Sequence, residues 1–381
     1  MPGVPAAVLH AARGALVGAA VGETLASCVG DGALPGPVLG GRGELAGPWG
    51  PMTEAICVGA EAVARGGWPA LDGGPTEVVG AAIADVAHDR PPPLLADPDA
   101  TDAYRLVADL VAGRDPAGLG PPFEAIAEYA RCGTFVDAVS GALGRARSDP
   151  DRGRVVTLAA LAAGTVHGVT AIPSRWLTYV HGAGARPGLR VRDLLRLAER
   201  LVGFEERQPP PPRRRLGPLE VAEGVWASNI YGVRDFCDRH PDGAVVSMCP
   251  MGDRLDDFPV RRLVLLEDVP TRSANPHLAA VVAEVVASVA AFRGEGRQVL
   301  VHCHHGVSRT GLALRAWLMA TEGLTEDQAT PEVEARWPWL STVNTRFTAV
   351  LGEMEARLVG SLAGGGLRDV ELPTARQPVD P

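Results

Sequence analysis

Gln298 to Leu314, QVLVHCHHGVSRTGLAL, predict a strand, a short polar loop and a helix in direct succession. The residues up to His302 are apolar and β-branched enough for a buried strand, and from Gly311 onwards apolar residues recur at helical spacing. In a loop that opens a helix, the backbone N–H groups form a positively polarised hollow that suits a dianionic phosphoryl group. The stretch therefore predicts a phosphate-binding loop.

This loop contains one cysteine and one arginine, Cys303 and Arg309. The polarised loop would stabilise the cysteine as a thiolate, which is the nucleophilic form. Arg309 can close over the loop and hold two phosphoryl oxygens through its planar guanidinium group. Gly306 lets the backbone turn without a side chain in the way. The alternative, a structural cysteine on a core strand, leaves Arg309 and the glycines without a role.

The loop resembles the phosphate-binding loop of the protein tyrosine phosphatase superfamily, and its Ser308-Arg309 ending is similar to the dual-specificity branch. The matching positions are His302, Cys303, Gly306, Arg309, Thr310 and Gly311. The resemblance implies a cysteine-dependent phosphomonoester hydrolase that acts on a phosphorylated protein or a small phosphomonoester. It implies no metal and no cofactor.

Each loop residue has an expected role. Cys303 attacks phosphorus as the thiolate, Thr310 donates a hydrogen bond to the thiolate, and His302 orders the loop rather than acting as a base. The phosphate-binding residues are His304, His305, Gly306, Val307, Ser308 and Arg309. Below about pH 6.5 the two variable histidines could add charge and favour multiply phosphorylated or phosphoinositide substrates. Solvent-facing histidines without a role are the equal alternative.

A phosphatase of this type also needs an acid that protonates the leaving oxygen. In LVLLEDVPTRSANPHL, residues 263–278, a strand is expected to end at Glu267-Asp268 before a loop, so Asp268 is the candidate. The alternative is that Asp268 only caps a turn and that Glu267 or Asp257 is the acid. Cys249, at the end of a strand in VVSMCP, is a candidate redox partner that could form a reversible disulfide with Cys303.

Composition limits the other possibilities. The chain has 381 residues, which suggests about two domains, and its net charge of -9 argues against a general nucleic-acid binder. The six cysteines are scattered without metal-type pairs, which favours a reducing, cytoplasmic compartment. A lipoprotein cleavage box at Leu25 to Cys28 is the alternative, but Glu23 interrupts the apolar run before it. No segment is apolar enough to span a membrane, and the oligomeric state is open.

The first part of the chain, residues 1–206, predicts an Ala-rich, all-α bundle without strands. The expected helices are Ala6–Leu25, Thr53–Arg65, Thr76–His88, Thr101–Ala112, Pro122–Arg131, Thr134–Ala146, Val155–Val166 and Val191–Val202.

Three pieces of this part resemble the ADP-ribosylglycohydrolase family. They are Gly14 to Glu23, with glycines every four residues, Gly47 to Thr53, and Asp151 to Trp176. The paired Mg²⁺ ions of that family need oxygen ligands. Here Pro51, Met52, Gly153 and Arg154 stand at positions where the family motifs have Asp or Thr. We therefore expect no di-metal centre and no hydrolysis of ADP-ribose linkages, so this domain is a scaffold or a degenerate ligand-binding module.

QPPPPRRR, residues 208–215, lies within an expected linker at 207–216. Beyond it, residues 217–360 alternate strands and helices, which predicts an α/β dual-specificity phosphatase fold with the loop at the carboxyl end of a central parallel strand. The expected strands are 225–228, 244–248, 262–266 and 298–302, and the expected helices are 233–240, 276–292, 311–321, 326–335 and 342–358. Residues 361–381 are expected to form a flexible tail.

Overall fold

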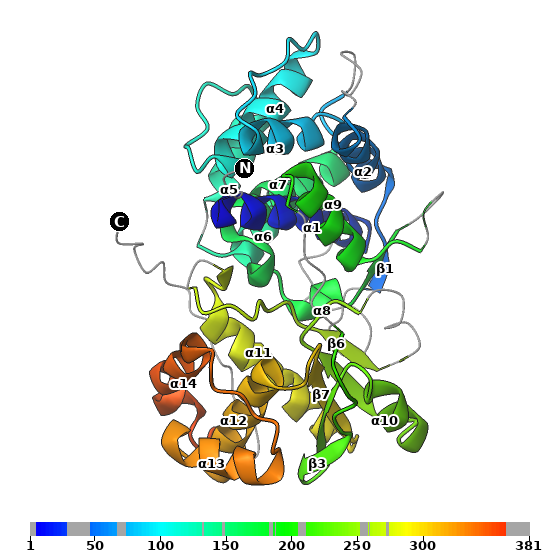
Figure 1. Ribbon diagram of the computed structural model, residues 1–381. Helices are drawn as coiled ribbons and strands as arrows, with labels where there is room; N and C mark the ends of the chain where they lie inside the picture. Colours follow the sequence, from blue (N-terminus) through cyan, green and yellow to red (C-terminus); the bar gives the residue numbers. More distant parts are fainter. Residues whose placement is uncertain are drawn as a thin grey trace. The chain divides into compact units, whose positions relative to one another are not determined.

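The computed structural model describes residues 5–28, 46–66, 74–131, 133–146, 149–182, 186, 188–204, 211–251, 258, 260–271 and 274–362. The chain divides into two compact units, Met1–Arg207 with Thr374–Pro381, and Gln208–Pro373 (Figure 1). Residues 207–210 of the expected linker and 363–381 of the expected tail lie outside the described residues. The finer domain limits stay a prediction. Within the described residues, no helix is long and apolar enough to cross a membrane.

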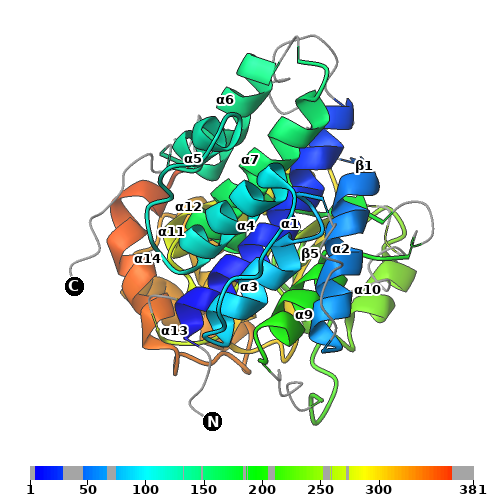
Figure 2. The same cartoon turned by 90° about the horizontal axis from the view of Figure 1, so that it is seen from above.

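The first unit is built around two helices in close contact, α1 (Ala6–Cys28) and α7 (Arg152–His167). A Cβ atom added at Gly14 would lie 1.8 Å from Gly164 O, and one added at Gly18 would lie 2.3 Å from Ala160 O. The glycines therefore let the two backbones touch. Figure 2 shows α1 running through the middle of this unit. The other expected helices are α2 (Pro51–Ala64), α3 (Val79–Ala87), α4 (Pro98–Val111), α5 (Phe123–Ala130), α6 (Phe135–Arg145) and α9 (Val191–Leu201).

The expectation of a purely helical first unit was wrong in one detail. Strands β1 (Ala46–Pro48) and β2 (Tyr179–His181) form a parallel pair. Each strand has three residues, which is too short to show the alternation of polar and apolar residues by which a strand is found in a sequence. The short helices η2 (Val169–Ala171) and α8 (Ser174–Leu177) were also not expected.

The second unit contains a five-stranded sheet in the order β3-β4-β7-β5-β6. The strands are β3 (Leu219–Ala222), β4 (Val225–Asn229), β5 (Ala244–Ser247), β6 (Arg261–Leu263) and β7 (Val299–Cys303). Among the strands that the structure describes in this sheet, only the β3–β4 pair is antiparallel, and β7 lies in the centre. All residues of β7 are buried, as expected of a parallel strand with both faces covered.

Two strand predictions needed correction. The edge strand β3 was missed, because it joins β4 through a tight turn and is partly exposed. The strand expected at 262–266 ends at Leu263, so Glu267 and Asp268 do not follow the strand directly. After β6 the chain runs through 264–269 without regular structure.

Helices cover both faces of this sheet (Figure 1). They are α10 (Val233–Arg239), α11 (Leu278–Gly294), α12 (Ser308–Glu322), α13 (Glu326–Arg336) and α14 (Thr345–Leu358), in agreement with the expected helices to within a few residues. The important difference is at α12, which begins at Ser308 rather than Gly311. Arg309 and Thr310 therefore lie on the first turn of the helix.

Candidate active site

Cys303 is the last residue of the central strand β7 and is 1% exposed. It lies opposite Asn229 of β4, and α12 begins at Ser308. The loop between strand and helix is therefore residues 304–307. It stands at the carboxyl end of a parallel strand, which is where open α/β sheets bind their ligands.

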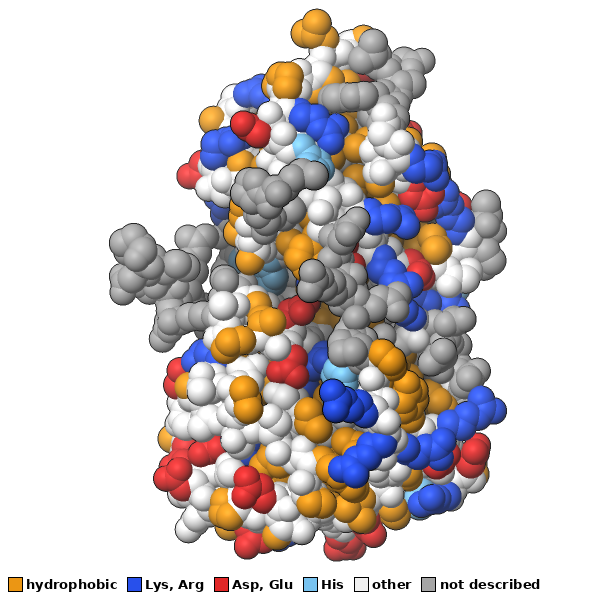
Figure 3. Space-filling model, viewed as in Figure 1, with side chains coloured by type: hydrophobic (Ala, Val, Ile, Leu, Met, Phe, Trp, Pro, Cys, Tyr) orange, Lys and Arg blue, Asp and Glu red, His pale blue; other side chains and the backbone are white. Residues whose placement is uncertain are grey.

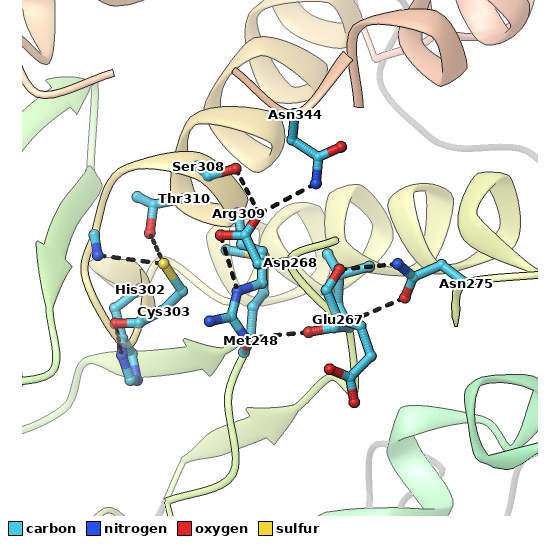
Figure 4. A network of polar contacts seen from close by, with 12 residues as sticks. Met248, Glu267, Asp268, Asn275, His302, Cys303, Ser308, Arg309, Thr310 and Asn344 are labelled. Atoms are coloured by element: carbon cyan, nitrogen blue, oxygen red, sulfur yellow. Dashed lines mark hydrogen bonds and ion pairs between the residues drawn. The ribbon is translucent and has the colours of Figure 1, made fainter. Parts of the chain in front are cut away.

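Two hydrogen-bond donors point at the sulfur of Cys303 (Figure 4). Gly306 N lies 3.3 Å from Sγ, and Thr310 Oγ1 lies 3.2 Å from it. The side chain of Thr310 is completely buried. Both donors favour a negatively charged sulfur, because a hydrogen bond to the charged form of a group stabilises that form. The structure thus brings Thr310 to the place that the sequence predicted.

Gly306 is held in a conformation that other residues rarely adopt. Its φ is 76°, and a Cβ atom there would lie 2.9 Å from Asn229 N and from Ser228 O. On its other side, Gly306 O accepts a hydrogen bond of 2.8 Å from Trp337 Nε1. Trp337 is fully buried, so it belongs to the core and supports the loop from behind. The sequence did not predict this contact.

His302 is fully buried on β7, and its Nε2 lies 2.6 Å from Ser247 Oγ on β5. Burial lowers the pKa of His302 to about 4. The imidazole is therefore neutral at neutral pH, and it links the two central strands beneath the loop. This geometry suits the ordering role that we expected for His302.

Arg309 is held by two backbone carbonyls. Its Nη1 donates to Met248 O at 2.9 Å and to Leu266 O at 3.1 Å. Burial opposes the charged form, but the nearby Cys303 and Cys249 and two carboxylates raise the pKa of Arg309 above its ordinary value. The guanidinium group therefore stays charged. Its Nε is buried and has no hydrogen-bond partner among the described residues.

Asp268 faces the loop from the segment after β6. Ser308 Oγ donates to its Oδ1 at 2.8 Å, Asn344 Nδ2 donates to the same oxygen at 3.2 Å, and Arg309 Nε lies 3.8 Å from Oδ2. About a third of the side chain is exposed, so the carboxyl group remains accessible.

The neighbouring Glu267 has a different environment. Its backbone N and O are both bound by the side chain of Asn275, at 2.9 and 2.8 Å. Its carboxylate points away from Cys303 in Figure 4. The structure therefore brings Asp268, and not Glu267, to the loop. The other alternative, Asp257, lies outside the described residues.

The remaining predicted residues lie around the same loop. His304 and His305 are half-buried, with ring centroids 4.8 Å apart in an edge-to-face arrangement. Val307 O accepts a hydrogen bond from Ser341 N. Cys249 is buried, and neither Cys249 nor Cys303 forms a disulfide in the structure, so a bond between the two stays a prediction.

The sequence did not single out Ser247, Asn275 or Asn344. Ser247 and Asn344 bind residues that are 55 and 76 positions away, which no local spacing records. Asn275 binds the backbone of Glu267 within the same loop. In the part of the chain that the structure describes, no group of three or more His, Cys, Asp or Glu residues could hold a metal ion.

Residues 260–357 match the family model of the dual specificity phosphatase catalytic domain. The second unit carries a dual-specificity phosphatase catalytic domain. Such a domain is a phosphoric monoester hydrolase. The match does not extend into the first unit, so the helical unit stays unassigned and its resemblance to ADP-ribosylglycohydrolases gains no support.

Two curated relatives resemble a short part of the chain. Rat dual specificity protein phosphatase 12 is 52% identical over 44 residues, which is 12% of this chain and 13% of the relative. The mouse protein of the same name is 50% identical over 44 residues, with the same coverage. The chain thus spans only 13% of the length of these relatives.

Solved structures resemble the phosphatase domain more distantly. Human DUSP28 is 23% identical, with 39% of this chain and 98% of that chain covered and a TM-score of 0.32. Tk-PTP in its active form is 23% identical, with 36% and 95% covered and a TM-score of 0.31. Identities and TM-scores in this range do not by themselves decide a function.

Proposed function

We propose that the phosphatase domain hydrolyses phosphomonoesters through a cysteinyl-phosphate intermediate. The Cys303 thiolate attacks phosphorus in line, the P–O bond of the leaving group breaks, and Asp268 gives its proton to the departing oxygen. Asp268, now a carboxylate, takes a proton from water as the water oxygen attacks phosphorus. The S–P bond then breaks and the thiolate is restored. The observation that carries this proposal is the pair of donors aimed at Cys303 Sγ.

Arg309 and the loop amides supply the electrostatic part of this mechanism. The charged guanidinium group has a buried Nε without a hydrogen-bond partner among the described residues, which suits a phosphoryl oxygen. Donors that are already in place, in a site with little water, stabilise the charge that develops on the phosphoryl oxygens. Thr310 lowers the energy of the thiolate and so makes it a better leaving group in the second step.

The test is hydrolysis of phenyl phosphate, whose leaving oxygen needs an acid, in EDTA and across about pH 5 to 8. We expect the wild type to turn over, Cys303→Ser to be inactive and Asp268→Ala to lose the limb of the pH profile that depends on a protonated acid. Turnover that needs an added metal, or that survives in Cys303→Ser, contradicts the proposal.

The rival function is a binding protein without turnover, which recognises phosphate or ADP-ribose. A phosphate-binding protein would use the same loop amides and Arg309, so binding alone does not separate it from a phosphatase. Vanadate binding by a wild type that shows no turnover with any ester would favour the rival. Profiling an active enzyme would identify the substrate. The candidates are a phosphorylated protein, a small phosphomonoester, an inositol lipid and an RNA 5′-phosphate.

A cytoplasmic location also stays a prediction.

For the first unit, we propose an ADP-ribosylglycohydrolase-like scaffold without catalytic activity. Support comes from the start of α2, where Glu23 accepts hydrogen bonds from Met52 N at 2.9 Å and Thr53 N at 2.7 Å. The carboxylate of Glu23 is thus bound by backbone N–H groups at the start of α2. Pro51 and Met52 have no side-chain oxygen that could bind a metal ion. Mg²⁺-dependent release of ADP-ribose by the purified protein would overturn this proposal.

A further inference from the structure

Asn344 occupies a helix-capping position without capping the helix. It directly precedes α14, and an asparagine there usually accepts a hydrogen bond from a backbone N–H of the first turn. Its side chain makes no such bond. Instead, Asn344 Nδ2 donates to Asp268 Oδ1 at 3.2 Å, as Figure 4 shows. The side chain is therefore directed to the acid rather than to its own helix.

The side-chain amide of Asn344 is buried in a way that does not favour the folded state. The residue is 6% exposed, and its Oδ1 is buried with no hydrogen-bond partner among the described residues. A buried amide oxygen without a partner opposes folding. Such groups are rare in folded proteins, and some of those that persist do so because they serve a functional site.

The two carboxyl oxygens of Asp268 have different partners. Oδ1 accepts from Ser308 Oγ and from Asn344 Nδ2, and the amide nitrogen can only donate. The reverse amide orientation would place an oxygen against the carboxylate. Oδ1 is thus saturated with donors, which leaves Oδ2 to carry a proton. Oδ2 lies on the side of Arg309, 3.8 Å from its Nε.

We propose that Asn344 is a positioning residue for the general acid. Together with Ser308 it fixes Oδ1, so that the proton transferred to the leaving oxygen resides on Oδ2, on the side of the guanidinium group that would bind the phosphoryl group. This inference rests on the proposed function, because it assigns a part to Asn344 only if Asp268 protonates the leaving group.

The experiment compares two esters that differ in their need for an acid. Nitrophenol leaves readily without protonation, whereas phenol does not. Asn344→Leu keeps the shape but removes the donor. We expect it to lose about tenfold in kcat/KM for phenyl phosphate, a part of the roughly 10²–10⁴-fold that a general acid contributes, and little for nitrophenyl phosphate. Thermal unfolding should show Asn344→Leu at least as stable as the wild type, because the partnerless buried oxygen is removed.

Two further variants complete the design. Asn344→Asp keeps the size and polarity but places a carboxylate against Asp268, and we expect the same selective loss for phenyl phosphate. Thr342→Ala changes an exposed side chain two residues away and should leave both rates unchanged.

The outcomes are separable. Equal rates for the wild type, Asn344→Leu and Asn344→Asp on phenyl phosphate, with Asp268→Ala impaired, would overturn the inference and leave the proposed function standing. Equal losses on both esters would also overturn it, since a general structural defect is not selective for the leaving group. A wild type that hydrolyses neither ester would overturn the proposed function, and the inference with it.

Discussion

Asp268 and Glu267 are neighbours in the sequence, yet the structure gives their side chains different surroundings. The backbone of Glu267 is bound by Asn275, while the carboxylate of Asp268 meets Ser308 and Arg309. The sequence could identify Cys303 and its loop because their chemistry depends on local spacing. It could only rank the two carboxylates, because Ser308 and Asn344, which bind Asp268, come from other segments of the chain.

At the scale of single residues, we predict a slower second step when the hydroxyl of Thr310 is removed. Thr310→Val keeps the shape but takes away the donor to Cys303 Sγ, so the sulfur becomes a poorer leaving group. A hydrogen bond to a charged group contributes about 1.5–3 kcal/mol, so kcat should fall by about tenfold or more. Rapid-quench kinetics should show the covalent intermediate accumulating.

The matched control for this prediction is Thr321→Val on the same helix. The hydroxyl of Thr321 donates to Trp317 O and does not approach the sulfur. If both variants slow turnover equally, the effect belongs to the helix and not to the contact with sulfur.

The low pKa of His302 leads us to predict that the fold becomes less stable in acid. Burial lowers its pKa to about 4 in the folded state, from an ordinary value of 6.5. The unfolded chain therefore binds the proton more readily, and the contribution of neutral His302 to stability is complete above about pH 6.5 and is lost as the pH falls towards 4. The shift corresponds to about 3 kcal/mol. Urea unfolding of the wild type and of His302→Gln at several pH values measures this, and equal pH slopes would contradict it.

At the scale of elements, the strand and the helix that flank the loop could be predicted from the pattern of apolar residues. The run of apolar residues predicts β7, and the apolar spacing predicts α12, although not its start at Ser308. The first turn of α12 was missed because Ser308 to Thr310 are polar, and the sequence signal for a helix is the spacing of apolar residues. The support of Gly306 by Trp337 was likewise invisible, because it joins the loop to a segment after α13.

The shape of the loop depends on Gly306. We predict that Gly306→Ala weakens vanadate binding by at least about tenfold, because the added methyl group meets Asn229 and Ser228 at a backbone conformation unfavourable for alanine. Isothermal titration with vanadate measures the change.

Gly323→Ala provides the control for that variant. Gly323 has a similar φ of 71°, but nothing lies within 4 Å of an added Cβ atom. This variant carries the same backbone strain without the collision, so it should lose some stability and keep its affinity for vanadate. Equal affinities in both variants would show that the loop tolerates the methyl group.

At the scale of the whole molecule, the sequence predicted two kinds of architecture in one chain, and the structure has a helical unit and an α/β unit. The family match covers only the second unit. The glycine pattern of α1 correctly indicated close helix contact, but helix contact alone does not identify a family. The order of the strands could not be derived, since it depends on pairings between segments far apart in the sequence.

The two units should respond separately to a packing change. Gly18→Ala places a methyl group 2.3 Å from Ala160 O, and we expect it to destabilise the first unit by about 1–3 kcal/mol. Phosphatase activity at room temperature should be unchanged. Gly144→Ala in α6, where an added Cβ meets nothing within 4 Å, is the control and should be neutral or stabilising. Scanning calorimetry together with an activity assay checks both, and a parallel loss of activity in Gly18→Ala would argue against independent units.

The most direct test of the proposed mechanism is to trap the intermediate. The wild type is mixed with nitrophenyl phosphate in EDTA and quenched in acid within the first turnovers, and peptide mass spectrometry then locates any added phosphoryl group. We predict one phosphoryl group on Cys303, and none when the same experiment is done with Cys303→Ser. A phosphoryl group on another residue, or turnover by Cys303→Ser, would contradict the mechanism.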